Sequence, residues 1–351
     1  MQGVTERRLA EGSAFHQSGG LRCRRPTLVR NLDPVECRLV ARGYNSCVTR
    51  SLNRREFLAG GAALASAASL PAAVPQIIDT HIHLYDPTRP QGVPWPPGTD
   101  PLLYQPMLPG AYAALVRPLG VTGAVVVEAS QWMEDNQWVL DLAKEHPVIV
   151  GLVGHLEPAA EGFAANLARF AKNPLFRGIR LNGDAIAGGM ARPAFVEDIQ
   201  RLADAGLMLD AIGNAAMIPA LTALTTRIPK LRIAIDHMPA EPAGWRNSRA
   251  DLLELARRPQ VYCKVSGVLK QVDGKVPEDL SAYQTALDEV WHAFGPDRVM
   301  YGSNWPVSNR LSPYETVLKV VQQYVHSKAA GDADKFFRRN SKACYQWLDR
   351  G

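Results

Sequence analysis

Cysteine is scarce in the main part of this sequence. The 351-residue chain has five cysteines, and three of them (Cys23, Cys37 and Cys47) lie in an arginine-rich N-terminal stretch without an apolar pattern. Only Cys263 and Cys344 remain after that stretch. A framework of disulfides is therefore excluded as the source of stability.

A hydrophobic run long enough to span a bilayer is also missing. Ala59–Leu70 is weakly apolar and falls short of the roughly 20 residues that a span needs. It follows Arg54-Arg55-Glu56-Phe57-Leu58 and precedes the small residues Pro71-Ala72-Ala73. A charged start, a short apolar stretch and small residues predict an export signal of the twin-arginine type over 51–73, with cleavage between Ala67 and Ala73. The alternative is a short amphipathic or buried helix.

Residues 1–50 are difficult to reconcile with a signal that follows them. They predict an unstructured extension, or a start codon placed too far upstream, with translation beginning near Val48 or Leu52. The folded part is then one domain over 74–351, which the signal would deliver to the periplasm or the medium. N-terminal sequencing of the precursor distinguishes the two explanations.

The folded part has no excess of charge of either sign. Removing the 11 arginines and 5 acidic residues of 1–73 from the 39 basic and 34 acidic residues of the whole chain leaves 28 and 29. This balance gives no basic face for nucleic acid, and no polybasic or amphipathic stretch suits a membrane surface. The expected partner is a small-molecule substrate, and the oligomeric state is left open.

Short apolar runs alternate with amphipathic stretches along the rest of the chain. About 278 residues is the usual size of one α/β barrel. Apolar runs without alternation indicate strands covered on both faces, and eight strand–helix pairs predict a (β/α)8 TIM barrel. An open doubly wound sheet would alternate too, but no Gly-x-Gly-x-x-Gly follows the first strand. The expected strands are 77–81, 123–128, 148–152, 178–181, 207–212, 232–236, 261–265 and 299–301, and the expected helices are 111–118, 136–146, 160–172, 193–205, 215–228, 249–258, 282–294 and 313–326.

Every predicted strand ends in, or contains, a polar or ionisable residue. The first ends in His81-Ile82-His83, whose two histidines lie on one side because alternate residues of a strand face the same way. In a barrel the active site lies at the C-terminal strand ends, so these residues predict one polar cavity. Along the chain they are His81 and His83, Glu128, His155, Arg180, Asp210, Asp236-His237, Lys264 and Ser266, and Asn304-Trp305.

With these motifs the chain from about 77 to 348 resembles the amidohydrolase superfamily, in its amidohydrolase-2 branch of lactonase-like barrel enzymes. The segments that carry the resemblance are Asp79-Thr80-His81-Ile82-His83, Phe176–Arg180, Ile235-Asp236-His237, Lys264–Gly267 and Arg298–Pro306. The resemblance implies hydrolysis of lactones or related carboxyl derivatives, sugar-derived or from aromatic breakdown. It also implies, for most members, a divalent metal such as Zn²⁺ or Mn²⁺.

The sequence departs from this family at the eighth strand. The family ends that strand with an aspartate that binds metal and takes a proton from water, whereas this chain has Asn304. An amide is not titratable near neutral pH and cannot be that base. His81 and His83 remain as the metal ligands, with His155 or Glu128 to complete a site, so a divalent metal and no metal both stay open.

The other candidates carry alternatives as well. The catalytic set is His81, His83, His237 and Asn304, and strand alternation turns Asp236 away from His237 toward a structural ion pair. Substrate binding is assigned to Arg180, Lys264, Glu128, His155 and Trp305. Arg180 pairs with a substrate carboxylate or forms an inter-strand salt bridge, and Lys264 binds an anion or acts as a desolvated base.

Three classes of function follow. The first is an exported hydrolase that opens a lactone ring. The second is an isomerase on the same substrates, which moves a proton without metal and which the loss of the eighth-strand carboxylate favours. The third is a barrel that only binds ligands. The substrate itself is not given by the sequence.

Overall fold

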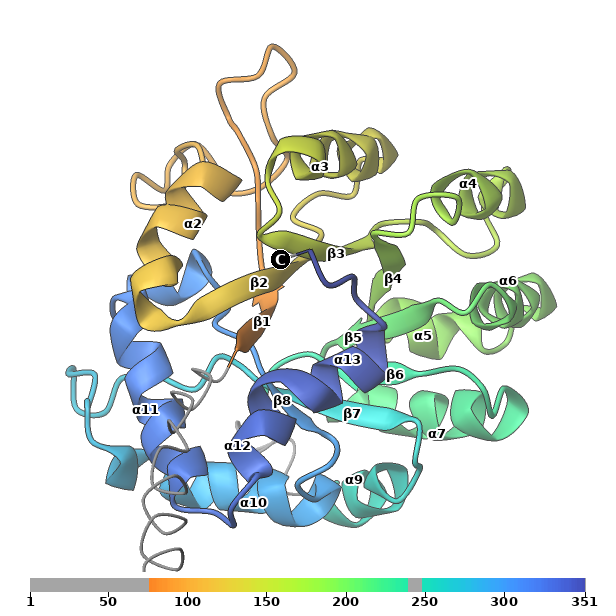
Figure 1. Cartoon of the computed structure of the whole chain (residues 1–351). Helices are drawn as coiled ribbons and strands as arrows, with labels where there is room; N and C mark the ends of the chain where they lie inside the picture. Colours follow the sequence, from red (N-terminus) through yellow and green to blue (C-terminus); the bar gives the residue numbers. More distant parts are fainter. Residues whose placement is uncertain (1–75, 239–247, 351) are drawn as a thin grey trace, which may run out of the picture. The chain divides into compact units, whose positions relative to one another are not determined.

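Eight parallel strands form the centre of the protein in the computed structural model, which describes residues 76–238 and 248–350. The strands pair in sequence order from β1 to β8 and make a nearly closed barrel (Figure 1). The predicted (β/α)8 barrel is thereby confirmed. The strands are β1 (Ile77–Ile82), β2 (Val121–Val127), β3 (Ile149–Gly154), β4 (Phe176–Asn182), β5 (Met208–Ile212), β6 (Ile233–Ile235), β7 (Val261–Val265) and β8 (Val299–Tyr301).

Helices surround the strands, and each predicted helix has a counterpart. These counterparts are α2 (Pro109–Val116), α3 (Met133–Glu145), α4 (Phe163–Phe170), α6 (Pro193–Asp204), α7 (Ile218–Arg227), α9 (Arg249–Ala256), α10 (Gln284–Phe294) and α11 (Tyr314–His326). The sequence did not predict α5 (Gly183–Gly189), α12 (Asp332–Asp334), a π-helical turn over Lys335–Arg339 or α13 (Asn340–Tyr345).

Contacts between the first and last strands bring the ends of the barrel together. The backbone N–H of Asn304 donates to the carbonyl of His81 at 2.9 Å, and that of His83 donates to the carbonyl of Trp305 at 2.8 Å. The buried carboxylate of Asp79 accepts the backbone N–H of Ser303 at 2.8 Å. Glycine is required at 302, because a Cβ there would lie 2.9 Å from the Cβ of His81.

The apolar strand residues divide between two clusters. Those facing outward pack under the helices, while those facing inward fill the barrel, which explains why the strands read as continuous apolar runs. The inward cluster consists of Ile78, Val125, Val127, Val150, Val153, Met208, Ala234 and Met300, together with three C-terminal side chains, Cys344, Tyr345 and Trp347.

The C-terminal segment closes the end of the barrel where the strands begin. Helix α13 crosses this opening, as the dark blue ribbon in Figure 1 shows. Arg177 donates from Nε to the carbonyl of Tyr345 at 2.8 Å, and Arg232 donates from Nε to that of Cys344 at 2.6 Å. The opposite end, where the strands finish, is therefore the end that remains available for a ligand.

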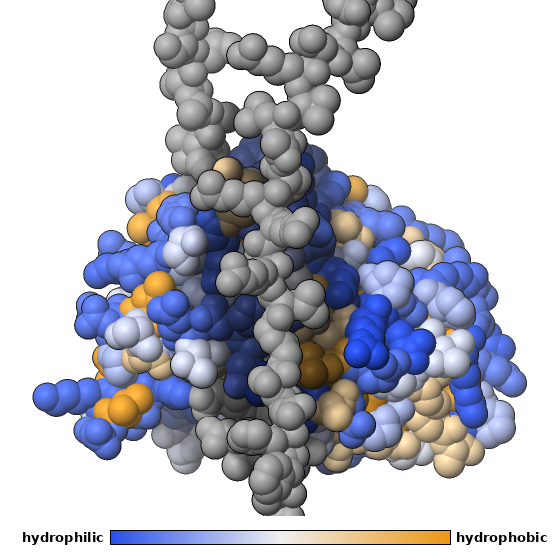
Figure 2. Space-filling view, turned by 90° about the horizontal axis from the view of Figure 1, so that it is seen from below, coloured by the Kyte–Doolittle hydropathy of each residue, from blue (hydrophilic) through white to orange (hydrophobic). Residues whose placement is uncertain are grey.

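The face of the protein that Figure 2 presents is mainly hydrophilic. Figure 2 shows one face, outside the atoms drawn in grey, with hydrophilic side chains in the majority and apolar ones scattered between them. Within the described parts of the chain, no helix is both long and apolar enough to cross a bilayer. The predicted extension over 1–50 and the predicted signal over 51–73 lie outside the described residues.

A chain that begins at Val74 should fold by itself. It keeps all eight strands and the C-terminal segment, since β1 begins at Ile77. We expect it to be soluble and to unfold in one cooperative transition, with a melting temperature within a few degrees of the full chain. Calorimetry of both chains measures this, and insolubility of the shorter chain alone would refute the leader assignment.

Candidate active site

A cavity of about 500 Å³ opens at the C-terminal ends of the strands. Five of the side chains that the sequence predicted for the site line it, and they are His83, Glu128, Arg180, His237 and Asn304. The rest of the lining comes from Pro94, Trp95, Ala129, Ser130, Gln131, Ile212 and Val307. Such a mixture of aromatic walls and a few polar groups suits a small organic ligand.

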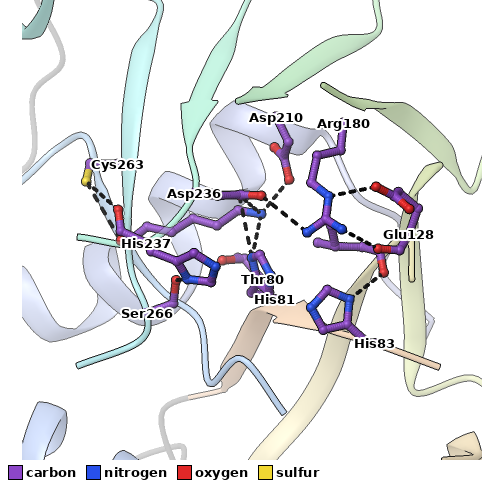
Figure 3. A network of polar contacts seen from close by, with 12 residues as sticks. Thr80, His81, His83, Glu128, Arg180, Asp210, Asp236, His237, Cys263 and Ser266 are labelled. Carbon is purple, nitrogen blue, oxygen red and sulfur yellow. Dashed lines mark hydrogen bonds and ion pairs between the residues drawn. The ribbon is translucent and has the colours of Figure 1, made fainter. Parts of the chain in front are cut away.

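His81 and His83 lie together, as the strand periodicity predicted. Their ring centroids are 5.0 Å apart, and His83 lines the cavity while His81 is fully buried beneath it (Figure 3). Nδ1 of His83 is 3.0 Å from the carbonyl of Val127, which makes Nδ1 the donor and leaves Nε2 without a proton in the neutral ring. Burial, with the charge of Arg180, lowers the pKa of His83 to about 3, so the ring is neutral at physiological pH.

His237 joins these two histidines, and so does its neighbour Asp236. The His237 and His81 rings are 4.7 Å apart, while Oδ1 of Asp236 is 3.5 Å from Nδ1 of His81. The ion pair predicted for Asp236 is present, with Lys264 at 2.8 Å. The expectation that Asp236 turns away from His237 is wrong, since both lie beside His81. Strand β6 ends at Ile235, and His237 has φ of 63°, so the alternation of a strand no longer applies there.

The ring of His237 is held on its other side by the residue that follows strand β7. Nδ1 of His237 is 2.9 Å from Oγ of Ser266. Burial lowers the pKa of His237 to about 4, and the nearby Asp236 carboxylate opposes that shift. The free site thus presents a neutral imidazole whose protonated form has a carboxylate close by to stabilise it.

Arg180 and Glu128 form a pair on the cavity wall. Nε of Arg180 donates to Oε1 of Glu128 at 2.9 Å, and Nη2 donates to the Glu128 carbonyl at 2.7 Å. Nη1 lies 3.9 Å from Oδ2 of Asp236. Arg180 thus makes the inter-strand salt bridge that the sequence allowed as an alternative, yet it also lines the cavity, where it can meet a substrate.

Lys264 lies beneath the cavity instead of lining it. Its Nζ is 2.5 Å from Oδ2 of Asp210 and 2.8 Å from Oδ1 of Asp236, and all three side chains are fully buried. Burial alone would lower the pKa of Lys264, but the two carboxylates raise it above its ordinary value. Burial raises the pKa of Asp210 to about 7 against the pull of Lys264. A buried cation that is paired twice in this way is unsuited to serve as a free base or as a direct anion ligand.

Asn304 is placed by an unusual backbone conformation. Its φ of 61° is left-handed, which asparagine tolerates better than most residues, and the turn directs its amide to the cavity that His83 and His237 line. The four residues predicted to converge do lie together. His83, His237 and Asn304 line the cavity, and the ring of His81 is buried beneath them.

Two predicted substrate-binding residues besides Lys264 lie outside the cavity lining. His155 is 3.9 Å from Glu157 through Nε2, and its backbone is bonded to Asn136. Trp305 is buried and packs against Tyr112 with ring centroids 5.2 Å apart, so it supports the turn after β8. Sequence reasoning missed Tyr345, whose hydroxyl donates to Oδ1 of Asp210 at 2.9 Å from the C-terminal segment.

Comparison with known proteins identifies the family. The sequence matches the amidohydrolase family model over residues 78–347. The chain belongs to the amidohydrolase family. It is accordingly a hydrolase, as its sequence predicted.

Similar proteins agree with this placement. An L-fucono-1,5-lactonase of Burkholderia ambifaria is 33% identical over 236 residues, which cover 66% of this chain and 80% of the relative. An L-fucono-1,5-lactonase of Burkholderia multivorans is 27% identical, with 76% and 95% covered. A zinc-bound crystal structure of an amidohydrolase from Burkholderia multivorans is 26% identical with a TM-score of 0.70, and the match covers 78% of this chain and all of that one.

The side chains of this amidohydrolase do not fit a tightly held divalent metal, although family members often use one. Among residues 76–238 and 248–350, no group of three or more histidine, cysteine, aspartate or glutamate side chains could hold an ion. Asn304 offers only a neutral carbonyl oxygen, and an ammonium group lies 3.3 Å from Nδ1 of His81. No step of the reaction is therefore assigned to a metal.

Proposed function

We propose that this amidohydrolase opens the ring of a small lactone, with a sugar-derived 1,5-lactone as the first substrate class to examine. The observation that carries the proposal is the composition of the cavity, in which Arg180, two neutral histidines and the Asn304 amide surround about 500 Å³ beside Trp95. These groups match an uncharged ester that becomes a carboxylate during the reaction. The two relatives named L-fucono-1,5-lactonase support the same class.

In the proposed reaction, water attacks the carbonyl carbon of the lactone and the ring C–O bond breaks. His237 is the proton acceptor that we assign, because it is neutral, lines the cavity and has Asp236 close by to stabilise its protonated ring. The proton then passes to the departing ring oxygen, which leaves as a hydroxyl group. The product is a hydroxy acid, which releases one proton to solvent at neutral pH.

In this scheme Arg180 and Asn304 stabilise the negative charge that forms on the substrate. The Arg180 fork suits the two oxygens of the carboxylate that forms, and Glu128 holds it in place. The Asn304 amide donates a hydrogen bond to the oxygen that becomes negative during attack. Neither residue moves a proton, and this division of roles follows from their side-chain chemistry.

A panel of lactones with a pH indicator tests this function. Ring opening releases acid and isomerisation does not, so acidification above the spontaneous rate supports the hydrolase. Conversion of substrate without release of acid would instead support an isomerase. Such an enzyme is compatible with Asn304 in the place of the aspartate that the family usually has. Binding without any conversion would indicate a barrel that only binds ligands, and it would refute both proposed enzymatic functions.

We further propose that the protein is exported folded through the twin-arginine route. The support is the Arg54-Arg55-Glu56-Phe57-Leu58 segment followed by Ala59–Leu70. Changing both arginines to lysine should retain the protein in the cytoplasm, while the unchanged chain should be recovered from the periplasm or the medium. Equal distribution of the two chains between fractions would contradict this route.

A further inference from the structure

A cluster of three charged side chains is buried below the cavity, and one of them, Asp236, lies 3.9 Å from Arg180 on the cavity wall. Lys264 bridges Asp210 and Asp236, which Figure 3 shows side by side, and the hydroxyl of Tyr345 donates to Asp210 as well. Burying charges is costly unless they are paired, and a pair is seldom more stabilising than an apolar core. The cluster therefore calls for a role beyond stability, and its Lys264 lies beside one histidine of the site, His81.

Lys264 approaches a particular atom of that histidine. Its Nζ lies 3.3 Å from Nδ1 of His81, within hydrogen-bond distance. An ammonium group has donors only, so Nδ1 must be the acceptor and carry no proton. Oδ1 of Asp236 is farther from the same nitrogen, at 3.5 Å, and is already paired with Lys264 at 2.8 Å.

The proton of the neutral His81 ring then lies on Nε2. Because Nδ1 accepts from the ammonium group of Lys264, the ring carries its one proton on the other nitrogen. Nε2 is itself buried and has no hydrogen-bond partner among the described residues. The rings of His83 and His237, which line the cavity, lie 5.0 Å and 4.7 Å from the His81 ring. An unpaired buried donor at this position is costly until an acceptor reaches it.

We infer that Lys264 is a positioning residue that keeps the proton of His81 on Nε2, so that His81 donates a hydrogen bond to the substrate carbonyl oxygen and cannot bind a metal there. A metal ligand needs a lone pair on the coordinating nitrogen, and a protonated Nε2 has none. The part concerning substrate rests on the proposed lactone hydrolysis. The part concerning the tautomer and metal does not.

The tautomer can be observed directly in the unaltered full chain. Nitrogen-15 spectra of histidine-labelled protein distinguish a ring protonated at Nε2 from one protonated at Nδ1, and His81→Gln identifies the His81 signals by their loss. We expect the Nε2–H form in protein free of metal. The Nδ1–H form, or a doubly protonated ring, would overturn the inference whatever the lactone assays show.

A pair of variants tests the role of Lys264. Lys264→Met combined with Asp210→Asn removes one charge of each sign, so the net charge of the cluster is unchanged. Nδ1–H of His81 can then donate to Asp236, which frees the lone pair on Nε2. Asp210→Asn alone is the matched control, because it keeps Lys264 beside His81.

Titration with Zn²⁺ by calorimetry is the second readout. The double variant should bind Zn²⁺ at least about tenfold more tightly than the control and should show the Nε2 signal without its proton. Equal affinity in the two variants, with the His81 tautomer unchanged, would overturn the role of Lys264. If the double variant does not fold, the spectrum of the unaltered chain still decides the inference. Should acid release from lactones fail while the Nε2–H form is found, only the proposed function is refuted.

Discussion

Asn304→Ala should lower kcat/KM for lactone opening by about 10²–10³-fold, because removal of one donor to a developing oxyanion has an effect of that order. Asn304 lines the cavity together with His83 and His237, and its left-handed backbone fixes where the amide points. The variant should still fold, although alanine in this left-handed conformation costs about 1 kcal/mol of stability, because the atoms removed face the cavity. Steady-state kinetics with melting curves separates this loss from unfolding, and an unchanged kcat/KM would exclude Asn304 from the reaction.

Asn304→Asp should change a different property, the affinity for divalent metal. It returns a hard anionic ligand beside His83 and His237, where the unaltered chain offers a neutral amide. We expect tighter binding of both Zn²⁺ and Mn²⁺ in calorimetric titrations that are run in parallel with lactone assays. Equal affinity in the variant and the unaltered protein would contradict this account of the site.

Arg180→Lys should lower turnover by about 10- to 100-fold, because charge-assisted hydrogen bonds contribute about 1.5–3 kcal/mol each. Lysine keeps the positive charge but cannot bond with two oxygens in parallel or hold both Glu128 contacts. Melting temperature should change little, since lysine keeps a positive charge beside Glu128 and Asp236, even though the Arg180 and Glu128 side chains are largely buried, at 13% and 15% exposure.

Arg201→Lys is the matched control for this prediction. Arg201 pairs with Asp198 at the surface of α6, with a side chain that is 49% exposed, and lies away from the cavity. It should leave both kinetics and stability unchanged. If Arg180→Lys instead lowered the melting temperature as much as a core substitution such as Val125→Ala, its salt bridge would be structural and its assignment to substrate would be wrong.

The barrel could be predicted because each strand is a short apolar run with a helix after it. Residues such as Val125 and Val126 face opposite sides and are both buried, one inside the barrel and one under the helices, so the run has no gaps. The closure of the barrel by α13 could not be predicted in this way. Tyr345 reaches Asp210 only because the C-terminal segment folds across the strand beginnings, and no local pattern encodes that contact.

The candidate site was predictable where strand geometry alone decides it. His81 and His83 are neighbours because they are two residues apart at the end of β1, and Arg180 and Asn304 lie at other strand ends. Prediction failed at Asp236 because the left-handed backbone of His237 ends the alternation. For Lys264 the sequence did not indicate that two carboxylates and His81 surround it, because that arrangement depends on residues in or beside three other strands at once.

Hydrolysis of a sugar-derived 1,5-lactone in water enriched in oxygen-18 tests the central claim most directly. Mass spectrometry of the product should show a hydroxy acid with a single labelled oxygen in its carboxyl group. It should form much faster with the unaltered protein than with Asn304→Ala or without protein. A product of unchanged mass without label, or equal rates in all three samples, would contradict the account.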